Sequence, residues 1–527
     1  MRKEKNNVTI TINGEKISVR RDSLVIDAAS SLNISIPTLC HIKNEKPFTS
    51  CMICMVKDNS SNQLIPACST RVEENMDIIT DSPEVHHFRK AALELLLSEH
   101  LGDCEAQCRM ICPAFLNIPA VIRDIQLGNI DTALEKIIES IPIPKIISLI
   151  CKAPCEKGCR RKRHDAPLSI RSLMHYTAFT ANRKKVAKFA ESEKSAAIIG
   201  SGPAGLSTAW YLLQRGYKCV VFEKNNLLGG GLRSIPKTTL PPEIIDEEIA
   251  LIESAGCEFR RNREIKYLDI NVLKNLKTEF DAVVIAPGSA NGTIPDNFDM
   301  PDWLFTVGDI LVPTKQAVRS VADGRETAEE IDLFWKKNIP AEPQKHPHSS
   351  SYFDMYNKTH LKNRIDSRLG PLKDGDMEQF LKTASPDGKL EPDDKSGIFT
   401  PKNAEKESAR CLHCDCKKAE SCRLRDLATE YGASQKHYNT HLERTGKFIR
   451  NIDQNIIYEP GKCIKCGICV RICAKFAEKE GMTFTQHSHK TEVALPFNIP
   501  LSRGLGKAAD ECIKNCPTGA LALIINC

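Results

Sequence analysis

The chain of 527 residues has few aromatic residues, which make up 6% of its length. It also contains no apolar run of about 18 residues, so we expect no transmembrane helix. Its N-terminal sequence, MRKEKNNVTI, is charged and lacks the apolar core of a secretory signal, which predicts a cytoplasmic protein. Neither sign of charge is in large excess, because the chain contains 73 Lys and Arg and 67 Asp and Glu. A net charge of +6 gives no electrostatic reason to expect nucleic-acid binding.

Cysteine, in contrast, is abundant, with 23 residues. Twenty of them fall in four groups, at residues 40–68, 104–159, 411–422 and 463–516. Disulfides need an oxidising compartment that a chain without an export signal does not reach, so closely spaced cysteines indicate bound metal. Cys219 lies outside the groups in an apolar stretch and is expected to be a small buried hydrophobic residue.

The first group follows a predicted β-hairpin, VTITINGEKISVR at 8–20, with Asn13-Gly14 as its turn. Its spacing is C-x10-C-x2-C-x13-C, and four thiolates are enough for one [2Fe–2S] cluster. The segment PTLCHIKNEKPFTSCMICMVKDNSSNQLIPACST resembles the N-terminal domain of the large peripheral subunit of complex I and of iron-only hydrogenases. We expect a β-grasp ferredoxin domain, with structural zinc as the alternative. The expected ligands are Cys40, Cys51, Cys54 and Cys68.

The second group reads HLGDCEAQCRMICP at 100–113 and CKAPCEKGC at 151–159. Both segments resemble the helical N-terminal domain of the glutamate synthase small subunit and of dihydropyrimidine dehydrogenase, over roughly residues 100–335. The resemblance implies two [4Fe–4S] clusters. One would take His100, Cys104, Cys108 and Cys159, and the other Cys112, Cys151 and Cys155 with its fourth ligand open.

His100 departs from that family's pattern, because it stands where the first cysteine is expected. A His-x3-Cys pair also opens the histidine-ligated cluster of the complex I subunit. We therefore expect the imidazole to replace a thiolate, which changes the net charge of the site. The alternative is a histidine that caps a helix C-terminus beside Gly102.

The third site lies in AAIIGSGPAGLSTAWYLLQRGYKCVVFEK, at 196–224. Gly200, Gly202 and Gly205 follow a predicted strand and open a helix, and Glu223 ends the next strand. Such glycines let backbone N–H groups approach a pyrophosphate, and the acidic residue accepts from a ribose hydroxyl, so the pattern predicts a dinucleotide site.

Two further segments, GGGLRSIP and FTVGDILVPTKQAVRSVADGRETAEEID, resemble the two-part flavin site of the disulfide-reductase-like family, which implies FAD. The expected cofactor-binding residues are Gly200, Ser201, Gly202, Pro203, Ala204, Gly205, Glu223, Lys224, Gly230, Gly231, Arg233, Ala286, Gly288, Gly308, Asp309 and Ala317.

The sequence contains no second glycine pattern of the G-x-G-x-x-G type, the fingerprint of a dinucleotide site. Glutamate synthase small subunits carry an inserted NADPH domain after the strand that matches DAVVIAPG, whereas here only about twenty residues separate Gly288 from Gly308. We therefore expect electrons to reach the flavin from a cluster, a substrate or a partner subunit. The opposing hypothesis is an NAD(P)H site without this fingerprint.

The third cysteine group has the spacing C-x2-C-x-C-x5-C, which favours a [4Fe–4S] cluster, with structural zinc as the alternative. Its expected ligands are Cys411, Cys414, Cys416 and Cys422, and His413 could substitute for one of them.

The fourth group contains the bacterial ferredoxin spacing C-x2-C-x2-C followed by a distant Cys-Pro, which predicts one [4Fe–4S] cluster. Its expected ligands are Cys463, Cys466, Cys469 and Cys516. Cys473 and Cys512 are interpreted as remnants of a lost second cluster, unless the 411–422 group contributes ligands to them. Both C-terminal groups resemble modules of iron–sulfur proteins associated with formate dehydrogenases and hydrogenases.

These features predict a multidomain α/β and α+β protein. The expected domains are a β-grasp [2Fe–2S] domain at 1–83, a helical domain with two [4Fe–4S] clusters at 84–190, a Rossmann-like FAD domain at 191–335, an extended linker at 336–405 and a ferredoxin-like module at 406–527. The expected cofactors are FAD, one [2Fe–2S] and three or four [4Fe–4S] clusters.

The expected function is an electron-transfer subunit of a multi-subunit oxidoreductase of formate dehydrogenase, hydrogenase or NAD(H) diaphorase type, whose flavin could bifurcate electrons. Its expected partners are other redox subunits or ferredoxin. The main alternative is a stand-alone NAD(P)H-dependent reductase similar to glutamate synthase, and a metal-bearing scaffold is a further one.

Overall fold

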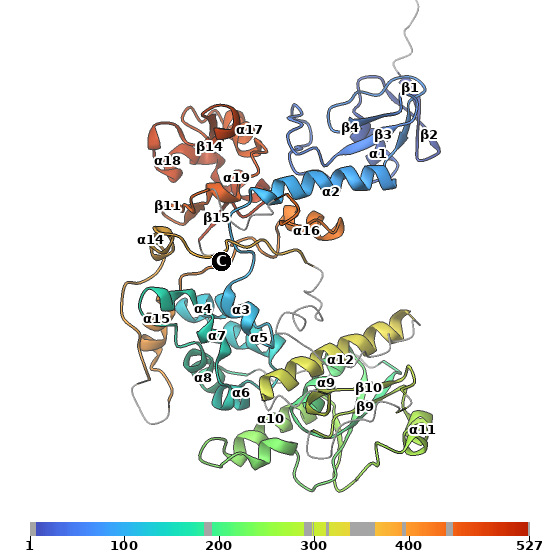
Figure 1. Cartoon of the computed structure of the whole chain (residues 1–527), viewed down its shortest axis with the longest axis vertical. Helices are drawn as coiled ribbons and strands as arrows, with labels where there is room; N and C mark the ends of the chain where they lie inside the picture. Colours follow the sequence, from blue (N-terminus) through green and yellow to red (C-terminus); the bar gives the residue numbers. More distant parts are fainter. Residues whose placement is uncertain are drawn as a thin grey trace, which may run out of the picture. The chain divides into compact units, whose positions relative to one another are not determined.

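The computed structural model describes residues 7–183, 192–288, 298, 300–311, 316–337, 364–392, 397–438 and 446–524. These residues form two compact units (Figure 1). Unit 1 comprises Met1–Ala106, Asn363–Thr383 and Cys414–Cys527, and unit 2 comprises Gln107–Lys362 and Ala384–His413. Each unit is therefore assembled from segments that are far apart in the sequence.

Unit 1 begins with a five-stranded mixed sheet of order β2-β1-β5-β3-β4. Its strands are β1 (Asn7–Ile12), β2 (Glu15–Arg20), β3 (Met55–Asp58), β4 (Gln63–Pro66) and β5 (Asp77–Ile79). Side chains alternate between the two faces of β1, so Val8, Ile10 and Ile12 point into one core. Helix α1 (Val25–Ser31) packs into the same core. Asn13 and Gly14 both have positive φ, as a tight hairpin turn requires. This sheet with one covering helix is the expected β-grasp arrangement.

Helix α2 (Pro83–Ser98) connects this sheet with the C-terminal part of unit 1. The Ser82 side chain caps its N-terminus by accepting from Val85 N, at 3.2 Å. Arg89 is buried, donates to Met55 O at 2.8 Å and donates to the Tyr431 hydroxyl at 2.9 Å. One guanidinium therefore ties β3 to the residue that follows α16 (Arg423–Glu430).

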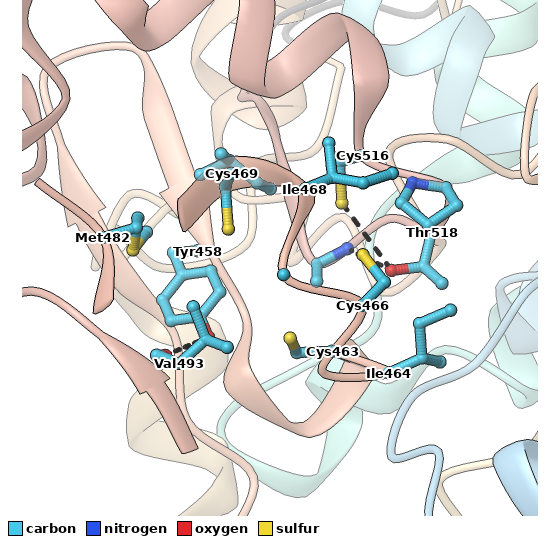
Figure 2. A pocket seen from close by; sticks show the side chains of 14 residues that line it. Tyr458, Cys463, Ile464, Cys466, Ile468, Cys469, Met482, Val493, Cys516 and Thr518 are labelled. Carbon is cyan, nitrogen blue, oxygen red and sulfur yellow. Dashed lines mark hydrogen bonds between the residues drawn. The ribbon is translucent and has the colours of Figure 1, made fainter. Parts of the chain in front are cut away.

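The C-terminal part of unit 1 is built on a three-stranded antiparallel sheet, β11-β12-β15. Its strands are β11 (Asn451–Asp453), β12 (Ile456–Tyr458) and β15 (Leu521–Leu523), with a second hairpin of β13 (Thr483–Thr485) and β14 (Glu492–Ala494). Its helices are α17 (Ile468–Lys475), α18 (Leu501–Leu505) and α19 (Ala509–Asn515), and α14 (Asp376–Leu381) also belongs to unit 1. Tyr458 on β12 faces the cysteine loop that precedes α17 (Figure 2).

Unit 2 contains a helical layer and a parallel sheet. The helices are α3 (Gln107–Ile111), α4 (Ile118–Gln126), α5 (Ile130–Ser140), α6 (Pro144–Ile150), α7 (Pro154–Lys157), α8 (Ile170–Thr180) and α15 (Pro401–Ala409). Prolines at the start of α4, α6, α7 and α15 suit the first helical turn, where an N–H has no intrahelical partner. Asn117 caps α4 by accepting from Ala120 N, at 3.4 Å.

The sheet of unit 2 is parallel throughout, with the order β10-β9-β6-β7-β8 of a Rossmann-like fold. Its strands are β6 (Ser195–Ile199), β7 (Lys218–Phe222), β8 (Glu258–Arg260), β9 (Ala282–Ile285) and β10 (Leu304–Thr306), and its helices are α9 (Pro203–Gln214), α10 (Pro242–Ser254), α11 (Ile270–Glu279) and α12 (Ala317–Lys337). Helices α9 and α12 pack closely, because Gly324 has no side chain to hold them apart.

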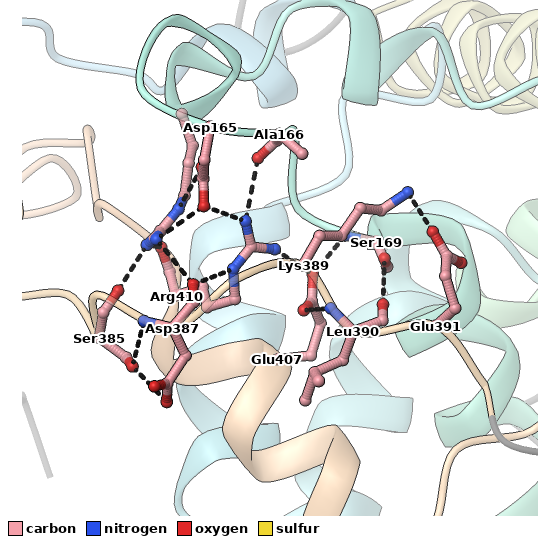
Figure 3. A network of polar contacts seen from close by, with 11 residues as sticks. Asp165, Ala166, Ser169, Ser385, Asp387, Lys389, Leu390, Glu391, Glu407 and Arg410 are labelled. Atoms are coloured by element: carbon pink, nitrogen blue, oxygen red, sulfur yellow. Dashed lines mark hydrogen bonds and ion pairs between the residues drawn. The ribbon is translucent and has the colours of Figure 1, made fainter.

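A buried ion-pair network attaches residues 384–413 to the helical layer of unit 2 (Figure 3). Arg410 is fully buried and donates to Glu407 Oε1 at 2.7 Å and to Asp165 Oδ2 at 2.8 Å. Arg161 donates to Asp165 Oδ1 at 2.9 Å and to the carbonyl of Ser385 at 2.8 Å. The Glu407 carboxylate also accepts from the backbone N–H groups of Ser169 and Leu390, at 2.9 and 2.8 Å.

The pKa of Asp165 shows that this network stabilises the ionised form of its carboxylate. Partial burial opposes its ionisation, but hydrogen bonds from Arg161 and Arg410 hold the pKa of Asp165 well below its usual range. The network lies at the end of the segment expected to be a linker, whose residues 338–363 are outside the described residues. In the described helices, none is both long and apolar enough to cross a membrane.

We expect Arg410→Met to weaken the attachment of residues 384–413. The variant leaves Glu407 buried without its cation, and breaking a buried pair costs about 3–5 kcal/mol. Hydrogen exchange followed by mass spectrometry should show a loss of protection in residues 384–392 and 397–413. The matched control is Lys336→Met on α12, which removes an exposed pair with Asp332 and should cost under about 1 kcal/mol. Equal protection in the two variants would contradict this role of Arg410.

Candidate dinucleotide and iron–sulfur sites

A cavity of about 530 Å³ opens at the carboxyl ends of β6, β7 and β9. Its volume lies within the usual range for a small-molecule or cofactor site. Gly200 has φ +112°, and a Cβ at this position or at Gly205 would collide with backbone oxygens, of Ala286 and Gly200 respectively. Gly200 and Gly205 are therefore required by the close approach of loop, strand and helix, whereas Gly202 borders open space.

Glu223 lies at the end of β7, where it organises the loop at the edge of the cavity. One carboxylate oxygen accepts from Ser201 N at 3.1 Å and from Ser201 Oγ at 2.6 Å. The other accepts from Asn225 N at 3.0 Å. The carboxylate thus holds the first turn of the fingerprint loop beside the N-terminus of α9.

Thirteen of the sixteen expected cofactor-binding residues line this cavity. They are Gly200, Ser201, Gly202, Pro203, Ala204, Glu223, Lys224, Gly230, Gly231, Ala286, Gly288, Asp309 and Ala317. The other three act beside it. Gly205 and Gly308 permit close packing, and Arg233 donates to the carbonyl of Leu228, at 2.6 Å.

Sequence reasoning missed other polar residues of the lining, among them Arg263, Glu264, Gln316 and Ser320. Arg263 and Glu264 follow β8, whose carboxyl end meets the same edge of the sheet as β7. The strand order of a parallel sheet could have identified them. Gln316 precedes α12, so the cavity runs from the N-terminus of α9 to the start of α12.

The four cysteines of the first group converge in unit 1. All are buried, and the thiol of Cys40 has its pKa lowered by hydrogen bonds with Cys51 and Cys68. A hydrogen bond with Cys68 likewise lowers the pKa of Cys54. The expected [2Fe–2S] ligands are therefore neighbours, although residues 55–67 with two strands separate the last two.

Cys463, Cys466, Cys469 and Cys516 also converge, and their sulfur atoms point into one enclosed space (Figure 2). The rest of the lining is largely apolar and includes Ile468, Met482 and Val493. Burial raises the pKa of the Cys466 thiol to about 12, and nearby Cys516, Cys463 and Cys40 add to the shift. Cys40 and Cys51 of the first group are buried in the same apolar core as Cys466, so the two groups share one part of unit 1.

In unit 2, Cys112, Cys151 and Cys155 lie together, as expected. Burial raises the pKa of Cys155 well above its usual value, and Cys112 and Cys151 raise it further. Cys108 on α3 and Cys159 after α7 are held by the packing of these two helices, where Gly158 leaves room for Ile111.

The remaining expected ligands are divided between the units. Cys108, Cys159 and Cys411 belong to unit 2 and pack against the same apolar core. His100, Cys104, Cys414, Cys416 and Cys422 belong to unit 1. Burial, reinforced by Lys462, lowers the pKa of His100 to about 4, so its ring is neutral at physiological pH.

Cys473 on α17 and Cys512 on α19 form a separate buried pair, with their sulfur atoms 3.9 Å apart. Among the described residues, no three His, Cys, Asp or Glu side chains are grouped as ligands of a single metal ion. The thiolates of an iron–sulfur cluster bind different iron atoms and stand further apart than the ligands of one ion.

Comparisons with known proteins identify three kinds of domain in the chain. Family profiles described as a 2Fe-2S iron–sulfur cluster binding domain, dihydropyrimidine dehydrogenase domain II with a 4Fe-4S cluster, and an NAD(P)-binding Rossmann-like domain match residues 5–83, 98–186 and 198–250. The chain therefore combines [2Fe–2S], [4Fe–4S] and Rossmann-like domains.

Similar curated proteins are subunits of oxidoreductases. The chain is 35% identical over 220 residues to NADPH-Fe(3+) oxidoreductase subunit beta of Geobacter sulfurreducens, covering 39% of this chain and 32% of the relative. It is 34% identical to NADP(+)-dependent formate dehydrogenase subunit beta of Moorella thermoacetica, covering 35% and 29%. It is 33% identical to NAD-dependent dihydropyrimidine dehydrogenase subunit PreT of Escherichia coli, covering 40% and 52%. The matches thus span between about a third and a half of each relative.

We expect Gly202→Val to weaken nucleotide binding without unfolding the chain. Gly202 has φ −71°, which valine can adopt, and it lines the cavity. A Cβ added to Gly202 would meet no described atom within 4 Å. The valine side chain therefore occupies part of the cavity in which the nucleotide would bind. Losing about 1.4 kcal/mol or more of contact weakens binding at least about tenfold. The nucleotide content of the purified protein measures this effect. The matched control is Gly388→Val in unit 2, which is equally open but outside the cavity lining. Equal content in both variants would contradict the assignment.

Proposed function

We propose that this chain is a flavin- and iron–sulfur-containing subunit that relays electrons between redox modules of a multi-subunit oxidoreductase. The observation that carries the proposal is a succession of cysteine sites within unit 1. Cys40, Cys422 and Cys466 are buried in one apolar core of unit 1, and Cys516 packs against it. The Cys422 Sγ also lies 3.8 Å from the carbonyl oxygen of Pro517, the residue after Cys516. Closely spaced thiol groups support carriers near enough to exchange electrons in series.

We propose FAD as the nucleotide. The fingerprint loop alone suits either FAD or NAD(P), but the cavity continues from α9 to Asp309, Gln316 and Ala317 beside α12. This second part of the lining belongs to the segment FTVGDILVPTKQAVRSVADGRETAEEID, whose sequence resembles a flavin site. A bound flavin would supply the exchange between two-electron and one-electron carriers. The chain's own contribution is the α9 N-terminus for the pyrophosphate and Glu223 for a ribose hydroxyl.

The proposed cofactor content is FAD, one [2Fe–2S] and three or four [4Fe–4S] clusters. The cysteines in the four groups would hold the clusters, and residues 406–527 would form a ferredoxin-like module. The architecture would combine a glutamate synthase-like core without its NADPH domain, a complex I-like N-terminal domain and this module. Twenty grouped thiols suit a reducing compartment, and we propose the cytoplasm.

The partners we propose are redox subunits of formate dehydrogenase, hydrogenase or NADH-dehydrogenase type, or ferredoxin. The NADPH-Fe(3+) oxidoreductase and formate dehydrogenase named above support a subunit of such a complex. The alternative is a stand-alone NAD(P)H-dependent reductase similar to glutamate synthase. It is favoured by the description of residues 198–250 as an NAD(P)-binding domain.

An anaerobic reduction experiment separates these two functions. We expect dithionite to bleach the flavin and cluster absorbance of the purified chain, whereas NADH and NADPH leave it unchanged for want of a second nucleotide domain. Nucleotide released by denaturation should be FAD, and chromatography would identify it. Rapid bleaching by NADH or NADPH, or release of NAD(P) in place of FAD, would instead support the stand-alone reductase.

A further inference from the structure

The loop that carries His100 and Cys104 is built into the C-terminal part of unit 1. Leu101 N donates to the carbonyl of Gly461 at 2.7 Å, and a Cβ on Gly102 would lie 2.5 Å from Lys462 Cε. Cys104 N donates to the carbonyl of Ser367 at 3.1 Å, and Ser367 Oγ donates to the carbonyl of Gly102 at 2.8 Å. Segments far apart in the sequence thus fix the position of this loop.

Cys416 and Cys422 approach Cys104 from the third cysteine group. Cys416 N donates to the carbonyl of Cys104 at 3.2 Å. Cys422 is also buried, and it stands directly before the helix α16 that carries Arg425. Arg425, on the helix that follows Cys422, donates to Glu105 Oε1 at 2.8 Å and to Asp366 Oδ1 at 2.5 Å. This buried ion-pair network locks the two cysteine segments together.

His100 supplies a fourth donor in the same region. Its side chain is 7% exposed, and Nδ1 is buried without a hydrogen-bond partner among the described residues. The C-cap position of α2 belongs to Glu99, whose N–H donates to the carbonyl of Leu97, and His100 stands one residue beyond it. Lys462 is buried beside the same loop, since its Cε would lie 2.5 Å from a Cβ on Gly102.

We propose that His100, Cys104, Cys416 and Cys422 together ligate one [4Fe–4S] cluster. The set differs from the family-based grouping of His100 and Cys104 with Cys108 and Cys159, and from a cluster held only by residues 411–422. All four donors lie in unit 1, whereas Cys108, Cys159 and Cys411 lie in unit 2. The orphaned imidazole nitrogen and three buried sulfur donors fit the chemistry of an iron–sulfur site.

The surroundings suit a cluster with one neutral ligand. Arg425 and Lys462 bring positive charge close to the three thiolates, and Glu105, Asp366 and Glu459 pair with these cations. The Cys422 Sγ lies 3.8 Å from the carbonyl oxygen of Pro517, the residue after Cys516, so the proposed site also adjoins the C-terminal cluster site. This cluster site rests on the proposed iron–sulfur content of the chain, and its cluster is one carrier in the proposed electron relay.

The decisive experiment uses Cys104→Ala, Cys416→Ala and the double variant, each purified anaerobically as the full chain. Iron, labile sulfide and low-temperature EPR spectra of the reduced protein are measured. We expect both single variants to lose the same EPR signal and one cluster equivalent of iron, and the double variant to lose no more. If the two cysteines belong to different clusters, the double variant loses two equivalents and the two single variants lose different signals, which would overturn the proposal.

Three comparisons make these results specific. Cys104→Ala combined with Cys463→Ala should lose two equivalents, because Cys463 belongs to another site. Cys219→Ala, which removes a buried thiol on β7 outside the groups, should lose none. An unchanged [2Fe–2S] EPR signal and nucleotide content show that a variant is folded. Wild-type protein without any [4Fe–4S] signal after reconstitution would refute the proposed function itself, a result distinct from a wrong ligand grouping.

The role of His100 is tested by His100→Cys. A thiolate in place of a neutral imidazole adds negative charge, so the variant should keep its full iron content while the reduction potential of the signal lost in Cys104→Ala falls. A potentiometric titration followed by EPR measures the change. An unchanged potential for that signal would show that His100 is not a ligand.

Discussion

The desolvation of thiols is the physical constraint on which most of this structure depends. Burial raises the pKa of Cys155, Cys422 and Cys469, because a thiolate loses water that no apolar neighbour replaces. Groups of buried thiols are therefore costly to ionise unless a cation replaces the lost solvation. Iron supplies that charge, so cluster binding and folding are coupled in the cysteine-rich parts of the chain. Arg425 and Lys462 add permanent positive charge where the neighbouring thiols are most crowded.

Much of the fold follows from local sequence. The hairpin around Asn13-Gly14 and the strand–helix–strand unit with its three fingerprint glycines form as the sequence predicts, because positive φ and close backbone contacts leave few alternatives to glycine and asparagine. The converging cysteines of the first and last groups also agree with their spacing. In these regions the interactions that define the structure join residues that are near in sequence or follow a regular period.

The assignment of the middle segments to the two units could not be predicted in this way. Residues 364–383 and 384–405 are polar and lack a hydrophobic period, so composition favours the linker expected at 336–405. Their attachment depends instead on buried charges such as Arg410 and Glu407, which in a sequence look like ordinary surface residues. Spacing likewise identifies Cys104 and Cys416 as potential ligands, but it cannot show that segments so far apart in the chain meet.

The discontinuous composition of unit 1 has a consequence for how the protein is made. Met1–Ala106 emerges from the ribosome first, but its partners in Cys414–Cys527 emerge only after unit 2 has been synthesised. At typical rates of translation this delay is on the order of tens of seconds. During that time the thiols of the N-terminal segment lack part of the structure that buries them and are open to oxidation. Cluster delivery to this chain must therefore either follow release from the ribosome or protect the waiting cysteines during synthesis.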